Sequence, residues 1–277
     1  MAYKRILTIQ DISCFGQCSL TVALPILSAC GLETCIIPSA VLSTHTGGFK
    51  DFTFKDLTDE IPKIEEHWLK EGIKFDSIYT GYLGSVRQID YVLDIFKRLV
   101  KEYCVKIVDP AFADNGVLYT GFDMNYVDEM KKLAAAADIV VPNISEACYL
   151  TGMEYMEEYT PVYIVELFEK LCALGCKTVI LTGVGYASDK TGVAVFNGKD
   201  ADYYEHTKIP KNCHGTGDIY ASAFAGAYLR GKPLMEAAKI AADYTYSCIA
   251  ATVDDKEHWY GVKFETVLPQ LISAING

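Results

Sequence analysis

Short apolar runs rich in β-branched residues alternate along this chain with longer stretches of helical spacing. The runs lack polar alternation, as strands covered on both faces do, and predict strands at residues 6–9, 34–38, 77–80, 105–109, 139–141 and 178–181. The stretches between them predict helices at residues 19–30, 61–71, 86–102, 125–136, 162–174, 217–230 and 234–251. A hairpin is expected where residues 193–196 and 203–206 are joined through Asn197-Gly198.

This order of elements is typical of parallel βαβ construction. It predicts an α/β fold, a doubly wound and mostly parallel sheet with helices on both faces, as a single domain over residues 1–277. With 51% apolar and 22% charged residues, the chain has enough apolar side chains for a full core and too few charges for a disordered protein. Ligands of such folds bind beyond the carboxyl ends of the strands, so the loops there should carry the chemistry.

Charge narrows the choice of partners. The formal net charge of −11 repels nucleic acid and anionic membranes, and neither is expected to bind. An anionic substrate would need local positive sources, which helix N-termini, main-chain N–H groups and a divalent cation supply. The ten cysteines are scattered without zinc-type spacing, and no apolar run reaches the ~18 residues of a membrane helix, so a cytoplasmic protein is expected.

The most informative segment is Gly215-Thr216-Gly217-Asp218, which directly precedes a helix of small residues. Two glycines let the main chain turn sharply and direct its N–H groups outward at a helix N-terminus, where an anion is favoured. Such a cradle suits a transferring phosphoryl group. Asp218 could then accept the proton of an attacking alcohol, and the helix dipole is expected to keep its carboxylate ionised. The spacing alone leaves equally open that Asp218 is merely a helix N-cap.

Other segments of the chain, taken together with Gly-Thr-Gly-Asp, decide between these two interpretations of Asp218. The Gly-Thr-Gly-Asp element resembles the anion hole of the ribokinase-like superfamily, and the chain is similar to its pyridoxal/pyridoxamine kinases at residues 43–48, 81–85, 109–110 and 140–146. The similarity runs from Ile6 to about Ala251. The resemblance implies an ATP-dependent kinase that phosphorylates the 5′-hydroxymethyl group of pyridoxal, pyridoxamine or pyridoxine in vitamin B6 salvage. It also implies a requirement for Mg²⁺ and a homodimer.

The resemblance assigns the phosphate-binding residues. Asp218 would be the catalytic base, and the amides of Gly215 and Gly217 would stabilise the transferring phosphoryl group. Contacts with ATP are implied for Thr216, Thr182, Gly183, Asp114 and Asn143. A plain strand-end turn is the alternative for Thr182, and an ordinary turn is equally open for Asp114, which precedes Asn115-Gly116.

The same family implies a metal site and a lid. Asp109 and Glu146 would hold Mg²⁺, largely through water, which agrees with the preference of this ion for oxygen ligands and retained waters. Residues 109–119 resemble the loop that closes over the phosphates. For Glu146 the alternative is a charge at the start of a helix, stabilised by the helix dipole.

Four residues match positions around the pyridine ring. His45 and Thr46 could bond polar groups of the ring, and Tyr82 could stack on it. Asp11 stands where many relatives have serine; its carboxylate would favour the cationic aminomethyl group of pyridoxamine, unless it turns away to cap a loop.

A hydroxymethylpyrimidine kinase of thiamine synthesis is the closest alternative, because it shares the fold and also phosphorylates a hydroxymethyl group on an aromatic ring. Relatives devoted to that pyrimidine often have cysteine at the position of Asp218, which favours the vitamin B6 interpretation. A catalytically silent relative is disfavoured by the intact Gly-Thr-Gly-Asp element together with Asn143 and Glu146.

Overall fold

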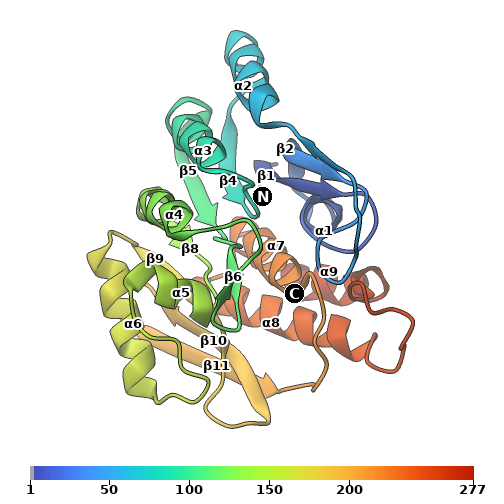
Figure 1. Cartoon of the computed structure of the whole chain (residues 1–277), viewed down its shortest axis with the longest axis vertical. Coiled ribbons are helices and arrows are strands. Elements are labelled where there is room, and N and C mark those ends of the chain that lie inside the picture. Colours follow the sequence, from blue (N-terminus) through green and yellow to red (C-terminus); the bar gives the residue numbers. More distant parts are fainter. Residues whose placement is uncertain (1–2) are drawn as a thin grey trace.

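The computed structural model describes residues 3–277, which form one large sheet flanked by helices (Figure 1). The nine strands lie in the order β11-β10-β9-β8-β5-β4-β1-β2-β3. Their bounds are β1 Arg5–Ser13, β2 Glu33–Leu42, β3 Phe54–Asp56, β4 Phe75–Thr80, β5 Val100–Val108, β8 Ile139–Val140, β9 Thr178–Val184, β10 Lys190–Phe196 and β11 Ala201–Thr207. The pairs from β2 to β9 are parallel, whereas β3, β10 and β11 pair antiparallel at the two edges. The predicted mostly parallel α/β sheet is confirmed.

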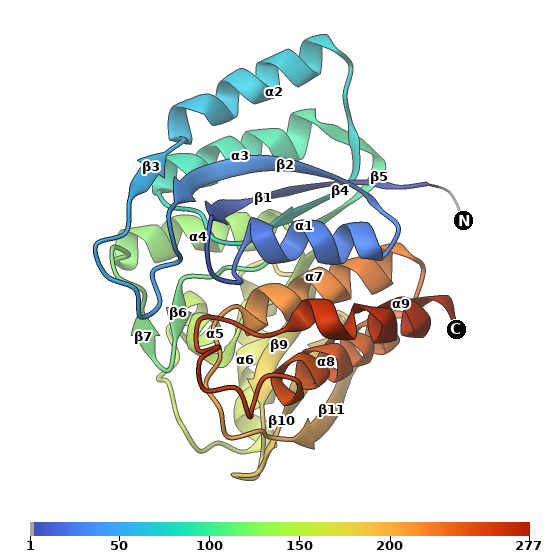
Figure 2. The ribbon, with the colours of Figure 1, turned by 90° about the vertical axis from the view of Figure 1, so that its right-hand side faces the viewer.

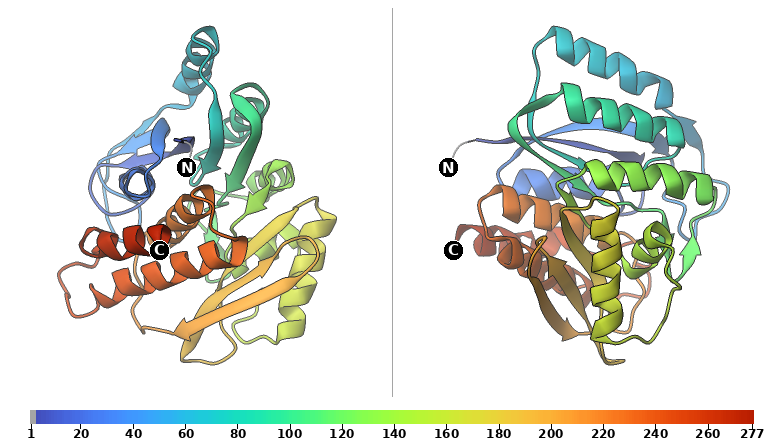
Figure 3. Two further views of the ribbon diagram at one scale, coloured as in Figure 1. Left: turned by 180° about the vertical axis from the view of Figure 1, so that it is seen from behind. Right: turned by 90° about the vertical axis from the view of Figure 1, so that its left-hand side faces the viewer.

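Helices cover both faces of the sheet. One face carries α2 Ile61–Lys70, α3 Val86–Arg98, α4 Met124–Ala136, α5 Ile144–Thr151 and α6 Pro161–Ala173, most of which lie in front of the sheet in the right-hand view of Figure 3. The other carries α1 Leu20–Ala29, α7 Thr216–Leu229, α8 Leu234–Ala250 and α9 Leu268–Asn276 (Figure 2). Adjacent residues of β1 serve opposite faces, since Ile6 packs with the second group and Leu7 with the first.

Most predicted elements are confirmed, including the β10–β11 hairpin. The helix predicted to reach residue 102 is too long: it ends at Arg98, and Val100 already pairs with Phe75 as the first residue of β5. The short elements β3, α5 and α9 were not predicted. The sequences of β3 and α5 are too brief to show a period, so packing against the rest of the fold decides them. The sequence of α9 does carry a helical period, with Leu268, Leu271, Ile272 and Ile275 on one face, and this helix was missed from the sequence.

The small residues of α7 have a packing reason. Gly226 lies so close to Cys30, the residue that ends α1, that a Cβ at Gly226 would collide with the Cys30 sulfur. This close approach seats α7 against α1 and the sheet. It thereby fixes the N-terminus of α7 near the carboxyl ends of the central strands.

The loops that follow the central strands gather at one side of the molecule. Figure 2 shows the arrowheads of β1 and β2 on the same side as the small hairpin of β6 Ala113–Asp114 and β7 Val117–Leu118. Asp109 follows β5 there, and Asn143 follows β8 after a short turn. Within residues 3–277, no helix combines the length and the apolar character that crossing a membrane requires.

Candidate active site

The N-terminus of α7 is open. Gly215 is its N-cap residue, in a left-handed conformation with φ of 75°, and no side chain caps the helix. A Cβ at Gly215 would collide with the carbonyl oxygen of Gln17, so this position requires glycine for the fold itself. The main-chain N–H groups of the first turn are therefore left uncapped by the described side chains, and such a helix end is a favourable place for an anion.

Gly217 differs from Gly215. Its backbone needs no left-handed conformation, and a Cβ there would meet no neighbouring heavy atom within 4 Å in the described part of the chain. The protein's own packing thus gives no reason for a glycine in the first turn of a helix, where alanine would stabilise the helix more. The space beside Gly217 suits a ligand that approaches the main chain closely, as a phosphoryl group does.

Asp218 is the third residue of α7 and not its N-cap, so the N-cap interpretation is wrong. The main-chain N–H of Ser19 donates to its Oδ2 at 2.9 Å. Burial raises the pKa of Asp218 to about 7; the Ser19 hydrogen bond opposes this shift and the nearby carboxyl of Asp11 adds to it. This raised pKa goes against the expectation that the helix dipole keeps Asp218 ionised, because lost hydration favours the neutral carboxyl. A pKa near 7 suits a general base at neutral pH.

Asp109 brings a buried carboxyl close to Asp218. It follows β5, and its main-chain N–H donates to the Thr80 carbonyl at 2.9 Å. Burial raises its pKa well above the usual range, and the carboxyls of Glu146 and Asp218 raise it further. A bound cation would relieve this repulsion, so the carboxyl groups fit Mg²⁺.

The carboxyl groups of the site suit a hydrated Mg²⁺ ion. Residues 3–277 contain no group of three or more His, Cys, Asp and Glu side chains arranged to hold a metal. Mg²⁺ commonly binds through one or two carboxylates, with water and substrate phosphates completing its shell. Asp109 is suited to that arrangement.

Glu146 and Asn143 form a capping box at the start of α5. Glu146 Oε2 accepts from the Asn143 N–H at 2.9 Å, and its Oε1 accepts from the Phe112 N–H at 3.0 Å. Asn143 accepts from the Glu146 N–H at 2.9 Å and donates from its side chain to the Ala113 carbonyl at 2.7 Å. Burial raises the pKa of Glu146 to about 8. The two side chains thus anchor the loop at residues 109–119, and a contact between Glu146 and Mg²⁺ would pass through water.

The loop predicted to be a lid contains the β6–β7 hairpin. Its tip is Asn115-Gly116, both with positive φ. In this conformation the Asp114 carboxylate accepts from the main-chain and side-chain N–H groups of Asn115, at 2.9 and 3.0 Å. The Gly116 N–H donates to the Ser145 hydroxyl at 2.8 Å, which docks the tip on α5. Asp114 therefore serves the turn here, and its contact with ATP stays a prediction.

Thr182 and Gly183 lie in β9 beside the start of α5. The Thr182 N–H donates to the Pro142 carbonyl at 2.9 Å, which places Thr182 next to Asn143. Gly183 has a φ of 74°, and a Cβ there would meet no heavy atom within 4 Å among the described neighbours. The surroundings of Gly183 are open, as a nucleotide contact requires, and the assignment of both residues to ATP stays a prediction.

Asp11 and Tyr82 lie near one another, and Asp11 also lies near Asp218. Asp11 is 5% exposed, and the Ser13 hydroxyl donates to its Oδ2 at 3.0 Å. Burial raises the pKa of Asp11, while hydrogen bonds from Ser19 and Ser13 oppose the shift. Burial also raises the pKa of Tyr82, and the charge of Asp11 adds to it. Asp11 is thus close enough to both Tyr82 and Asp218 to affect their ionisation.

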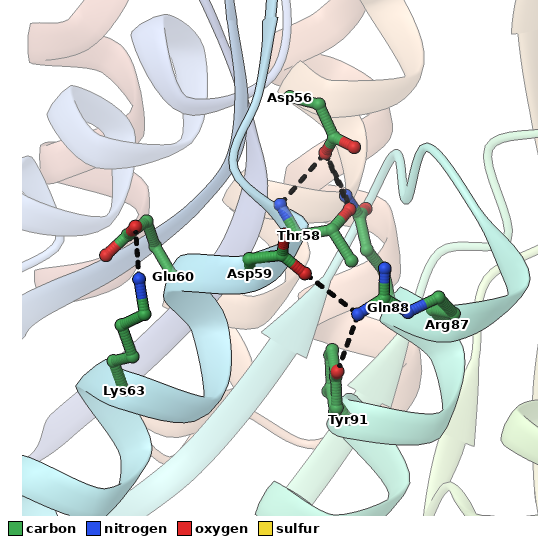
Figure 4. Close-up of polar contacts among 8 residues, drawn as sticks. All are labelled: Asp56, Thr58, Asp59, Glu60, Lys63, Arg87, Gln88 and Tyr91. Atoms are coloured by element: carbon green, nitrogen blue, oxygen red, sulfur yellow. Dashed lines mark hydrogen bonds and ion pairs between the residues drawn. The ribbon is translucent and has the colours of Figure 1, made fainter.

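The loop that carries Tyr82 is fixed by Gln88 of α3. Gln88 Oε1 accepts from the Gly84 N–H at 2.7 Å, and its Nε2 donates to the Ser39 carbonyl at 3.1 Å and the Thr58 hydroxyl at 2.8 Å. Figure 4 shows Gln88 directed toward Thr58 and Asp56, from the neighbouring element. The buried amide therefore ties this loop to β2 and leaves Tyr82 little freedom.

His45 has a different task from the one expected. Its Nδ1 accepts from the Gly47 N–H at 3.1 Å, so Nε2 carries the proton and donates to the Tyr260 carbonyl at 2.8 Å. Burial lowers the pKa of His45, which favours the neutral ring. Because both ring nitrogens hold main-chain groups, His45 fixes its loop and has no free nitrogen for a substrate in this conformation. Thr46, the next residue, is exposed, and its contact with substrate stays a prediction.

Ser19 was missed from the sequence. It touches Asp218 across a large chain separation and belongs to no motif, so a contact made only by the folded chain brings it to the site. No local signal could have found it.

The fold and the Asp218 site together define a small-molecule kinase of the ribokinase-like class. The model of the phosphomethylpyrimidine kinase family matches residues 24–262, and the chain belongs to this family.

Named relatives fall within the same class. A solved structure of a putative phosphomethylpyrimidine kinase from Bacteroides thetaiotaomicron, in a form with pyridoxal, is 38% identical with a TM-score of 0.92, covering 98% of this chain and 96% of that one. Pyridoxal kinase from Lactobacillus plantarum is 29% identical with a TM-score of 0.90, covering 98% of each chain. Pyridoxal kinase of Dictyostelium discoideum is 28% identical over 82% of this chain and 78% of its own. The predicted kinase class and family are confirmed.

Activity should depend on the ionisation of Asp218. Its carboxylate must be unprotonated to accept a proton, and burial raises its pKa to about 7. We therefore expect kcat/KM to fall about tenfold per pH unit below that pKa and to level off above it, because kcat/KM follows the free enzyme. A profile measured at saturating Mg²⁺ checks this. A kcat/KM that stays constant from pH 8 to pH 5 would contradict the assignment.

The two glycines should respond differently to alanine. Gly217→Ala places a methyl group in the open space, and we expect kcat/KM to fall by roughly 10²-fold, as when one transition-state donor is lost, with no loss of thermal stability. Gly215→Ala is the matched control: its positive φ and the Gln17 carbonyl predict destabilisation of ~1–3 kcal/mol. Steady-state kinetics and thermal unfolding measure both. Full activity of Gly217→Ala would show that no phosphoryl group approaches there.

Proposed function

We propose that this protein is an ATP-dependent kinase that phosphorylates the 5′-hydroxymethyl group of a vitamin B6 form: pyridoxal, pyridoxamine or pyridoxine. The observation that carries the proposal is the Asp218 carboxyl, held by the Ser19 N–H at the open N-terminus of α7 and given a pKa of about 7 by burial. The proposed base and the proposed anion-binding N–H groups therefore lie in the same first turn of α7. The named pyridoxal kinases and the Bacteroides protein with pyridoxal support the vitamin as the alcohol.

The reaction follows from this geometry. Asp218 accepts the proton of the 5′-hydroxyl as its oxygen attacks the γ-phosphorus of ATP, the bond to the ADP oxygen breaks, and ADP leaves with the electron pair. The N–H groups at the start of α7, between Gly215 and Gly217, stabilise the charge on the transferring oxygens. Asp109 and Glu146 would hold Mg²⁺, largely through water, and the ion would neutralise charge on the phosphates.

The remaining residues divide between the two substrates. Thr182, Gly183, Asn143 and, after lid closure, Asp114 are proposed to contact ATP together with Thr216. Tyr82, Asp11 and Thr46 are proposed to contact the pyridine ring, and the buried charge of Asp11 favours the cationic pyridoxamine. Homodimer formation and a cytoplasmic location stay predictions.

Hydroxymethylpyrimidine is the second candidate substrate. The observation in its favour is the family match, because that family is described by the phosphorylated pyrimidine. Its hydroxymethyl group would meet the same base and the same cradle. The choice between a vitamin B6 form and hydroxymethylpyrimidine therefore depends on the residues proposed to contact the ring.

A coupled assay of ADP release tests the function. With pyridoxal, pyridoxamine, pyridoxine and hydroxymethylpyrimidine as alcohols, we expect turnover with the vitamin forms to exceed that with the pyrimidine. Asp218→Asn should lower kcat by ~10² to 10⁴, the contribution of general-base catalysis, with the affinity for ATP nearly unchanged.

The unfolding temperature of Asp218→Asn serves as a control, because it shows whether the variant stays folded. A carboxyl whose pKa is raised on folding destabilises the folded state as pH rises from its unfolded value toward 7, so Asp218→Asn should unfold at the same or a higher temperature at pH 8. Near-normal turnover in Asp218→Asn would remove Asp218 from the mechanism. A preference for hydroxymethylpyrimidine would replace the vitamin as substrate.

A further inference from the structure

Ser19 has a backbone conformation that its side chain does not favour. Its φ is 54° and its ψ is −131°, a combination open to glycine but rarely adopted by other residues. Ser19 is the N-cap residue of α1, yet its side chain makes no capping hydrogen bond. The start of the helix therefore gives no reason for a strained serine at this position, although serine is usually favoured as an N-cap because it makes that bond.

The conformation directs the Ser19 N–H toward the Asp218 carboxyl. This N–H donates to Asp218 Oδ2 at 2.9 Å, while the Ser19 carbonyl accepts from the N–H groups of Val22 and Ala23 at 3.0 and 2.8 Å. The residue is thus held by α1 on one side and by Asp218 on the other. A carboxylate has two oxygens, and this bond engages Oδ2 while Oδ1 stays available for the alcohol.

The side chain of Ser19 connects a second acid. Ser19 is 5% exposed, and its side chain lies close enough to the Asp11 carboxyl to oppose the rise in the pKa of Asp11. Ser19 also forms an isolated β-bridge with Ile12, the residue after Asp11 in β1. The bridge to Ile12 and the nearness of the hydroxyl to Asp11 therefore hold Ser19 against β1 and oppose any relaxation of its main chain toward an ordinary conformation.

We propose that Ser19 is a positioning residue for phosphoryl transfer: its strained main chain orients the Asp218 carboxylate, and its hydroxyl, which lies beside Asp11, locks that strained conformation. The proposal rests on the proposed role of Asp218 as the base. A glycine would adopt the same φ and ψ without strain but would also leave them freely. The strained conformation thus gives the orientation that the hydroxyl maintains. Relieving the strain at Ser19 should raise the stability of the fold and lower turnover.

Two variants of Ser19 separate strain from orientation. Ser19→Gly removes both the strain and the lock, so we expect kcat to fall about ten- to a hundredfold, as for a misplaced catalytic group, with the KM of both substrates within about twofold. Ser19→Ala removes the lock but keeps the Cβ that causes the strain. Its kcat should fall to a similar extent, and its Tm should lie about 2 °C or more below that of Ser19→Gly.

Tyr103→Gly is the matched control. Tyr103 also has a positive φ, 64°, and is 89% exposed in the first half of β5, far from the strand end that leads to Asp109. Its replacement should keep or raise the Tm, because it relieves a similar strain, and should leave kcat unchanged.

Steady-state kinetics and thermal unfolding of the full chain decide the matter. A normal kcat in either Ser19 variant, a loss expressed only in KM, or a Ser19→Gly variant less stable than Ser19→Ala would overturn the proposal. A failure of the proposed function itself is detected with a different variant of this chain, because it would appear as normal turnover in Asp218→Asn.

Discussion

The partial burial of the Asp218 carboxyl at the start of α7 is the constraint on which the rest of the site depends. Removing this group from water raises its pKa to about 7, and a carboxyl near its pKa can both accept and release a proton at neutral pH. The burial is tolerable because the Ser19 N–H replaces part of the lost hydration. Had Asp218 been the N-cap of α7, solvent and the helix N–H groups would have kept it a weak base.

The fold produces this burial by close packing of distant segments. Gly226 lets α7 approach Cys30 at the end of α1, and Gly215 lets the start of α7 lie against the Gln17 carbonyl. Strand ends then deliver the other acids: Asp11 from β1 and Asp109 after β5. The Asp109, Glu146 and Asp218 carboxyls repel one another, and a bound divalent cation would offset this repulsion.

The sequence predicted those parts of the site that lie within one segment. The alternation of strands and helices predicted the sheet, and the Gly-Thr-Gly-Asp element predicted a cradle and a base in the first turn of α7. The ionisation of Asp218 could not be predicted, because it depends on how deeply distant elements bury the carboxyl. The distant hydrogen-bond partners of His45 and Glu146 were equally hidden: Tyr260 and Phe112 supply main-chain atoms from other segments, whose positions no residue pattern encodes. The capping box between Asn143 and Glu146, in contrast, follows from their spacing.

A crystal structure with Mg²⁺, a non-hydrolysable ATP analogue and a vitamin B6 form tests the central claim most directly. The account predicts that the 5′-hydroxyl oxygen lies within hydrogen-bond reach of Asp218 Oδ1, at ~2.6–3.2 Å, while Oδ2 keeps its bond to Ser19. It also places the γ-phosphate against the N–H groups at the start of α7, beside Gly217. A 5′-hydroxyl directed away from Asp218, or a γ-phosphate bound elsewhere than at α7, would contradict the account.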